Sequence, residues 1–349
     1  MKYLKLLVGL LVVLAITLGI QTGVFAKTDL EKAAIKEGKV GWYGAWPKPL
    51  MDTVAKAFRV HYPEIAVMIF RSGTGVVAAK LSAEKEAGKV LCDVLTVSDL
   101  SVYRDFKKKG FLEKYTPEEY QKFDEKLRDP DGYWVTPRSY TVGIWYNVEG
   151  LKKAGLDPPT SWRSLTDPKY KKRIVLGSPF YSATSLITVG QFLNVPGWGW
   201  DYWKKVLAND PLLIRDTPDI ARTVAAGERE IGPCIWAYIS MFPLYPKGTV
   251  KVVVPEEGLI VVQSSSSLVK GGPNPNAGKL FQKFLMSAEL GKIISDEFYY
   301  SGRVDVASPP GMPILGELKL LTPDDAWLEE NKRDIHKMWT TLSGEKEKK

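Results

Sequence analysis

Two short segments of this chain combine glycine, serine and threonine in a way that suits the binding of an anion. They are Ser72-Gly73-Thr74-Gly75 and Ser182-Ala183-Thr184, and each is followed by a run with helical spacing. At a helix N-terminus, free backbone N–H groups and hydroxyls hold negative oxygens without a cationic side chain. We therefore expect one anion to lie between the two segments. Taken alone, either segment also fits a simpler interpretation, in which serine and threonine only cap a helix and the glycines close a tight turn.

Polar and aromatic residues follow other predicted strands, at the positions where open α/β sheets bind their ligands. Ser98 follows a strand in the first half of the chain, and Trp236 and Tyr238 follow a strand in the second half. Rings in such places can stack on a sugar or an organic cation, although packing in the core is an equal alternative for each of them. The predicted ligand-binding residues are Tyr43, Ser72, Gly73, Thr74, Ser98, Ser182, Thr184, Trp236 and Tyr238.

Residue patterns typical of catalysis are missing from the sequence. Residues 72–75 lack the Gly-Lys-Ser/Thr of a nucleotide-hydrolysing loop, and the chain has no HExxH or GxSxG motif. The only histidines are His61 and His336, which leaves few candidates for acid–base catalysis. We therefore predict a binding protein without a resident cofactor rather than an enzyme. A secreted enzyme or a sensing module is the remote alternative.

The elements that must position these residues alternate between strands and helices, which predicts a mostly parallel sheet covered by helices. Runs at 40–43, 65–70 and 93–97 are predicted strands of a first lobe, and a second strand–helix series opens at 174–179. The alternating run at 134–146 predicts a long strand that crosses between two lobes.

Two lobes are expected because the chain exceeds the roughly 250–300 residues at which a single hydrophobic core stops growing. We assign residues 27–137 and 265–349 to lobe one and residues 138–264 to lobe two, so that the chain crosses the hinge more than once. Cys92 and Cys234 then fall in different lobes, and we expect no disulfide between them.

Residues 1–26 are predicted to be a secretory signal peptide that is cleaved after Ala26. Lys2 and Lys5 precede an apolar run at 6–20, which is shorter than the ~20 residues of a membrane-spanning helix. A membrane anchor is the rival interpretation. Removal of the two lysines lowers the formal net charge from +8 to +6. Charges of both signs are mixed along the remaining chain, which argues against nucleic-acid binding. The small positive net charge mildly favours anionic ligands.

The segment at 146–174 resembles a signature of the periplasmic solute-binding proteins of ABC importers. It reads YNVEGLKKAGLDPPTSWRSLTDPKYKKRI and is similar to the run N…LKKAGL.PP.SW..L.DPKYK..I of the branch that includes ferric-iron binders. The segments at 39–45, 271–285 and 303–306 also resemble that family. The resemblance implies a type II periplasmic-binding-protein fold, a monomer with its ligand closed between two lobes. It also implies a periplasmic location and delivery of the ligand to an inner-membrane permease with its ATPase.

The resemblance leaves two ligand classes open. Ferric binders hold Fe(III) through adjacent tyrosine phenolates after a strand of lobe two, where this chain has Tyr238 beside Ala237 and Ile239. A ferric site would use Tyr43, Tyr181 and Tyr238. Relatives without the tyrosine pair take phosphorylated sugars, phosphonates and other small organic anions, which agrees with the two segments rich in serine and threonine. We therefore predict an oxyanion-bearing organic ligand, such as a phosphonate or a sugar phosphate, with ferric iron as the alternative.

Overall fold

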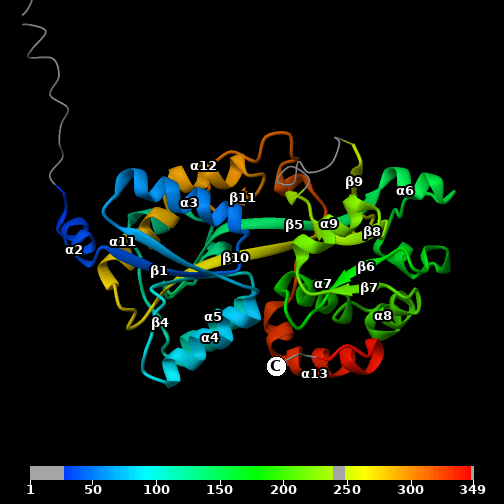
Figure 1. Cartoon of the computed structure of the whole chain (residues 1–349), viewed down its shortest axis with the longest axis horizontal. Coiled ribbons are helices and arrows are strands. Elements are labelled where there is room, and N and C mark those ends of the chain that lie inside the picture. Colours follow the sequence, from blue (N-terminus) through cyan, green and yellow to red (C-terminus); the bar gives the residue numbers. More distant parts are fainter. Residues whose placement is uncertain (1–26, 239–247, 347–349) are drawn as a thin grey trace, which may run out of the picture.

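The computed structural model describes residues 27–238 and 248–346. Within these ranges the chain forms two lobes that lie side by side (Figure 1). The predicted signal peptide, residues 1–26, lies outside the described residues. No helix of the described chain combines the length and the apolar character needed to cross a membrane.

Two long strands, β5 (Val135–Asn147) and β10 (Leu259–Val269), run antiparallel to each other from one lobe into the other (Figure 1). In the first lobe β10 pairs antiparallel with β3 (Val94–Val97). Strand β1 (Lys39–Gly44) pairs in parallel with both β3 and β2 (Ala66–Arg71). The two-lobe α/β fold is therefore confirmed. Its main sheet is mixed, because the strands that connect the lobes run in opposite directions.

The second lobe extends this sheet and adds a smaller one. Strands β8 (Ile231–Ile235) and β9 (Val250–Val253) pair antiparallel with β5. Strands β6 (Val175–Gly177) and β7 (Leu212–Ile214) form a separate parallel pair. Three short strands complete the described set: β4 (Leu112–Glu113), β11 (Tyr300–Ser301) and β12 (Leu320–Leu321).

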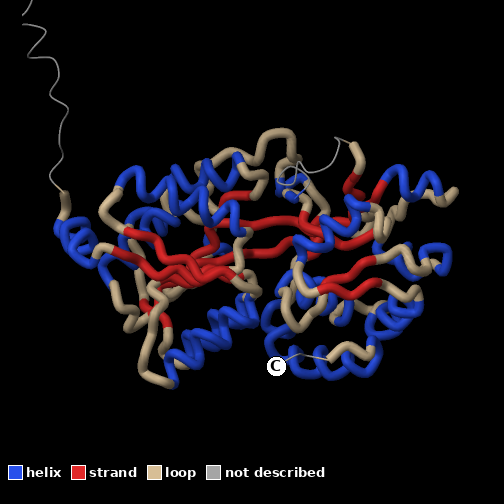
Figure 2. The backbone as a smooth tube through the Cα atoms, viewed as in Figure 1, coloured by secondary structure: helices blue, strands red, loops and turns tan. Residues whose placement is uncertain are grey.

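Helices lie on both sides of the strands in each lobe (Figure 2). Those of the first lobe are α2 (Asp29–Glu37), α3 (Lys48–His61), α4 (Thr74–Glu86), α5 (Leu100–Lys108), α11 (Pro275–Leu285) and α12 (Ala288–Asp296). Those of the second lobe are α6 (Val148–Lys153), α7 (Ala183–Leu193), α8 (Gly199–Ala208) and α9 (Thr217–Ala226). The last helix, α13 (Asp325–Ser343), contacts α5 in the first lobe and both α7 and α8 in the second. The lobe boundaries at 137/138 and 264/265 stay a prediction.

Amphipathic spacing explains how the helices attach to the sheet. In α3, Leu50, Met51, Val54 and Phe58 share one face and are fully buried. Strand β5 differs from the alternation seen in its sequence, because almost all of its residues are buried. It lies inside the sheet with neighbours on both edges, so that even its polar side chains are enclosed.

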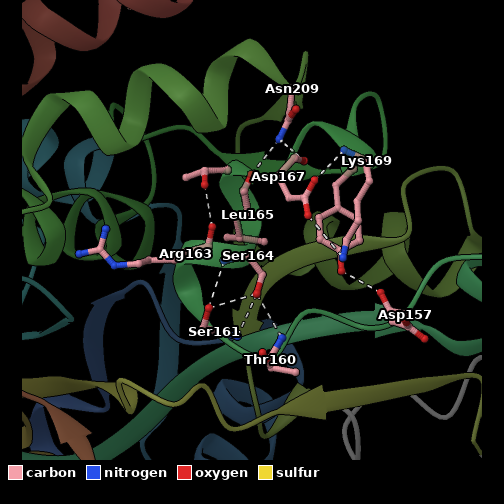
Figure 3. A network of polar contacts seen from close by, with 11 residues as sticks. Asp157, Thr160, Ser161, Arg163, Ser164, Leu165, Asp167, Lys169 and Asn209 are labelled. Carbon is pink, nitrogen blue, oxygen red and sulfur yellow. Dashed lines mark hydrogen bonds and ion pairs between the residues drawn. The ribbon is translucent and has the colours of Figure 1, made fainter.

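The long segment that carries the family resemblance builds a turn-rich part of the second lobe (Figure 3). The Ser161 hydroxyl caps the short turn Trp162–Thr166. Asn209 Nδ2, at the end of α8, donates to the carbonyl oxygens of Leu165 (2.9 Å) and Asp167 (3.0 Å) (Figure 3). These bonds satisfy backbone groups that no regular element would pair. The segment therefore acts as scaffold for the lobe, away from the site described below.

Candidate ligand-binding site

A small pocket, here called the inner pocket, lies where β5 passes between the lobes. Its volume is about 30 Å³. Both lobes contribute to its walls. It brings together six of the nine predicted residues: Gly73, Thr74, Ser98, Ser182, Thr184 and Tyr238.

Arg138 is the residue that gives the inner pocket its charge, and it was not among the predicted ones. It lies on β5, lines the pocket and is only 2% exposed. Its Nη2 donates to Ser264 Oγ (3.3 Å), whereas Nε and Nη1 have no hydrogen-bond partner among the described residues. A buried guanidinium without a carboxylate partner is costly. An anion bound beside Arg138 would satisfy these two donors and offset this cost.

Aromatic rings enclose this guanidinium. Its carbon lies 4.4 Å from the centroid of Tyr299 and 5.0 Å from those of Trp46 and Tyr140. Such contacts attract a cation and exclude water from it. They hold the side chain in place without neutralising its charge, so that the charge stays available to a ligand.

Ser264 on β10 fixes the position of Arg138. Its Oγ accepts hydrogen bonds from Trp46 Nε1 (2.8 Å) and Ser98 Oγ (2.9 Å) as well as from Arg138 Nη2. Ser264 and Arg138 face each other in the ladder between the two connecting strands, next to a shift in register after Ser264. The hinge strands therefore supply both the cation and the group that orients it.

Helix N-termini supply further donors, and the two predicted segments differ in how they use them. Gly73 precedes α4 in an extended conformation, and no side chain caps this helix. Ser182, in contrast, caps α7 by accepting from Ser185 N (3.2 Å) and shares a hydrogen bond with Thr217 Oγ1 (2.8 Å). The α4 terminus is thus free to bind an anion through its N–H groups, whereas the Ser182 hydroxyl already has partners.

Thr184, in the first turn of α7, also has a partner inside the pocket. Its Oγ1 lies 2.9 Å from the hydroxyl of Tyr140, which lines the pocket from β5. Either hydroxyl can act as the donor. The pair can therefore turn one O–H toward a ligand oxygen while remaining hydrogen-bonded to each other.

Direct contacts join the two lobes around the inner pocket. Arg71 Nη1, at the end of β2, lies 2.9 Å from Asp216 Oδ2, which caps α9 in the other lobe. Arg71 Nε also donates to the Trp46 carbonyl oxygen (3.2 Å). A Cβ at Gly73 would overlap the carbonyl oxygen of Tyr181. The lobes are thus closed on each other, and a glycine at position 73 permits this approach.

Three of the predicted residues, Tyr43, Ser72 and Trp236, do not line the inner pocket. Tyr43 packs on Phe70 and donates its hydroxyl to Glu84 Oε1 of α4 (2.7 Å), because that helix covers the face of β1 to which it points. Burial, followed by this hydrogen bond, raises the pKa of Tyr43. Ser72 donates its backbone N–H to the Gly44 carbonyl oxygen, and Trp236 donates its own to Thr141.

The three tyrosines of the ferric alternative are not brought together. Tyr238 lines the inner pocket, where burial raises its pKa well above the ordinary value. Tyr181 lies in a neighbouring cavity beneath the Arg215 guanidinium (4.1 Å), and Tyr43 is engaged by Glu84. In the described ranges, no group of three or more His, Cys, Asp or Glu residues is placed to hold a metal ion.

Sequence reasoning missed five polar residues that line the pocket at the end of β2, inside β5 and at the start of α9. They are Arg71, Arg138, Tyr140, Asp216 and Thr217. A charged residue within a strand predicted to be central was the available signal for Arg138, because arginine is rarely buried without a partner.

The chain matches a model of the bacterial extracellular solute-binding protein family over residues 91–326. The periplasmic binding protein AfuA from Actinobacillus pleuropneumoniae, solved with fructose-6-phosphate bound, is 25% identical, with a TM-score of 0.80 over 88% of this chain and 99% of that chain. A ferric binding protein from Campylobacter jejuni is 21% identical, with a TM-score of 0.72 over 87% and 99%, and shows a likeness of fold. A probable ABC transporter periplasmic-binding protein of Sinorhizobium fredii is 28% identical over 160 residues, which are 41% of this chain and 42% of that protein.

Proposed function

The chain belongs to the family of bacterial extracellular solute-binding proteins, the ligand-capturing components of ABC transporters, and we propose that its ligand is a small organic molecule that carries an oxyanion. A phosphonate or a sugar phosphate is a ligand of this class. The observation that carries the proposal is Arg138, a fully buried guanidinium with two donors that have no partner among the described residues.

The surroundings of Arg138 support an anion rather than a metal cation. The uncapped N-terminus of α4 directs N–H groups toward the same pocket. The pocket's one carboxylate within the described chain, Asp216, is already paired with Arg71. The net charge of the lining residues is therefore positive, and a phosphate or phosphonate group would complete it. The fructose-6-phosphate bound to the relative from Actinobacillus pleuropneumoniae belongs to the same chemical class.

Isothermal titration of the mature protein with inorganic phosphate, methylphosphonate and glucose 6-phosphate tests this proposal. Arg138→Met removes the charge and fills its space with an apolar side chain, which is often tolerated in the fold. Because hydrogen bonds to charged groups contribute about 1.5–3 kcal/mol, we expect affinity to fall about 10- to 150-fold. Arg59→Gln on the exposed side of α3 is the control for loss of one positive charge. Equal affinity in wild type and Arg138→Met would reject the proposal.

Ferric iron is the second candidate, and Tyr238 in the inner pocket is the observation in its favour. Phenolate ligands must lose their protons to bind the metal, which the raised pKa of Tyr238 opposes. A visible charge-transfer band after loading with ferric citrate, lost in Tyr238→Phe, would favour iron over the organic anion.

Proteins of this family deliver their ligands to a permease and an ATPase. We propose that this chain does so as a periplasmic monomer without catalytic activity, after removal of residues 1–26. Its lobes would comprise residues 27–137 with 265–349 and residues 138–264. Mass spectrometry of the secreted protein would test the cleavage after Ala26.

A further inference from the structure

A second, larger cavity, here called the outer cavity, adjoins the inner pocket. Its volume is about 430 Å³. The two share Thr74, Ser182 and Ala183 as lining residues, so that they meet at the N-termini of α4 and α7. A ligand whose anionic group lies in the inner pocket would extend through this junction, because the inner pocket has no room for more than a small group.

The walls of the outer cavity are mainly apolar on both sides. From the first lobe, α4 presents Val76 and Ala79, which lie one helical turn apart and are exposed. Val76 is 40% exposed. From the second lobe, Phe180, Tyr181 and Leu186 face them across the cavity.

Two charged side chains that line the outer cavity, Asp99 and Lys332, are paired with each other. Asp99 accepts from Lys332 Nζ (2.9 Å) and also caps α5 through Ser101 N (3.0 Å). The Arg215 guanidinium carbon lies 4.1 Å from the centroid of the Tyr181 ring. A sugar has many hydroxyls, and those buried against the apolar part of these walls would lose water without gaining partners, which is unfavourable.

We infer that the ligand's body is apolar or aromatic, so that the molecule is an aryl or alkyl phosphate or phosphonate rather than a sugar phosphate. This inference rests on the proposed function and narrows it. The anionic group would bind Arg138 and the start of α4, and the body would lie between the Val76–Ala79 face and Tyr181. Pockets of this kind bind mainly through apolar contact, with a few polar groups that fix orientation.

A titration of the wild-type protein with inorganic phosphate, phenyl phosphate and glucose 6-phosphate tests the inference. Because the ring buries apolar surface that the hexose does not, we expect phenyl phosphate to bind about tenfold tighter than glucose 6-phosphate or better. Glucose 6-phosphate binding as tightly as phenyl phosphate, or more tightly, would overturn it.

A matched pair of variants locates the effect. Ala79→Trp fills the outer cavity and should remove the advantage of phenyl phosphate while leaving the affinity for inorganic phosphate unchanged. Ala83→Trp, one turn further along α4, is exposed and does not line the cavity, so it should change neither affinity. Unchanged phenyl phosphate binding in Ala79→Trp would also overturn the inference.

The results separate this inference from the proposed function. If both esters bind through Arg138 but the aromatic one has no advantage, the inference fails and the proposed function stands. If neither ester binds, or if Arg138→Met changes nothing, both fail.

Discussion

The inner pocket and the outer cavity lie next to each other but are built from different elements. The inner pocket centres on Arg138 and Ser264, which belong to the two strands that connect the lobes. The outer cavity is enclosed by α4, the start of α7 and α13; α4 and α7 contribute mainly apolar side chains to it, and α13 contributes Lys332 and His336. A strand inside a sheet holds its charged side chain in one place. Side chains on a helix face, in contrast, can be substituted with little effect on the strands that connect the lobes. The comparison indicates that binding of the ligand's anionic group and binding of its body depend on different parts of this protein.

Helix α4 takes part in both regions. Thr74, at its uncapped N-terminus, lines both regions, whereas Val76 and Ala79 line only the outer cavity. A change at Thr74 should therefore affect every ligand, whereas a change at Val76 or Ala79 should affect only ligands with a body.

Gly73→Ala should have the largest effect, because it acts on the contact that closes both regions. A methyl group at Gly73 would overlap the Tyr181 carbonyl oxygen, a backbone atom that cannot move aside alone. Overpacking of this kind costs about 1–3 kcal/mol, so we expect all ligands to bind about 5- to 150-fold more weakly. In Gly75→Ala, the comparison variant, the added carbon would lie 3.3 Å from the Phe180 carbonyl oxygen, a tight contact without overlap, so affinity should fall less than in Gly73→Ala. Similar affinities in the two variants would show that the observed closure is not needed for binding.

Ser264→Ala should weaken the inner pocket alone. It leaves the Trp46 and Arg138 donors without their acceptor, and unpaired buried groups cost about 1–3 kcal/mol. We expect a lower midpoint in urea unfolding and about tenfold weaker phosphate binding. The ratio of the affinity for phenyl phosphate to the affinity for inorganic phosphate should not change. Ser267→Ala, on the same strand but bonded to the Tyr133 carbonyl oxygen, is the control for stability. A shift in the ligand ratio would show that the two regions are coupled.

The two helix starts can be distinguished by separate alanine variants. Ser182→Ala removes the cap of α7, so it should lower stability by about 1 kcal/mol. Thr74→Ala removes a hydroxyl from a helix start with no side-chain cap, so it should lower phosphate affinity a fewfold with less effect on stability. Urea unfolding and titration on both variants check this. Reversed results would mean that Ser182, and not Thr74, contacts the anion.

Asp325→Asn, at the start of α13, should have the smallest effect, and this effect should be on stability. Burial raises the pKa of Asp325 to about 6, against the opposing influence of Arg104. Because the folded state binds this proton more tightly than the unfolded state, the carboxyl lowers stability as pH rises from about 4 to 6. The variant should therefore melt higher than wild type at pH 7.5 and equally at pH 4. A difference that persists unchanged at pH 4 would contradict this account, and ligand affinity should not change.

Local composition predicted the parts of the site that depend on one segment. Gly73, Thr74 and Ser182 line the pocket as expected. They could be predicted because the sequence around each of them shows where a helix begins. Arg138 was missed because its role depends on Ser264 and three rings from distant segments. The contact of Tyr43 with α4 could not be predicted, because the sequence of a strand does not show which of its faces a helix will cover.

The sequence predicted the two-lobe fold more directly than it predicted how the strands pair within the sheet. Regular alternation of strands and helices predicted two α/β lobes, and β5 matches the predicted crossing strand within a residue or two. The direction of β10 relative to β3 and β5 is set by the pairing of distant residues, which local periodicity does not contain.

The crystal structure of the protein with a bound phosphate monoester would test the central claim most directly. The account predicts phosphate oxygens within hydrogen-bonding distance of Arg138 Nε and Nη1 and of the N–H groups that begin α4, with the body of the ligand against Val76. A phosphate bound elsewhere, with Arg138 making no contact to it, or a metal ion held by Tyr238 in its place, would contradict the account.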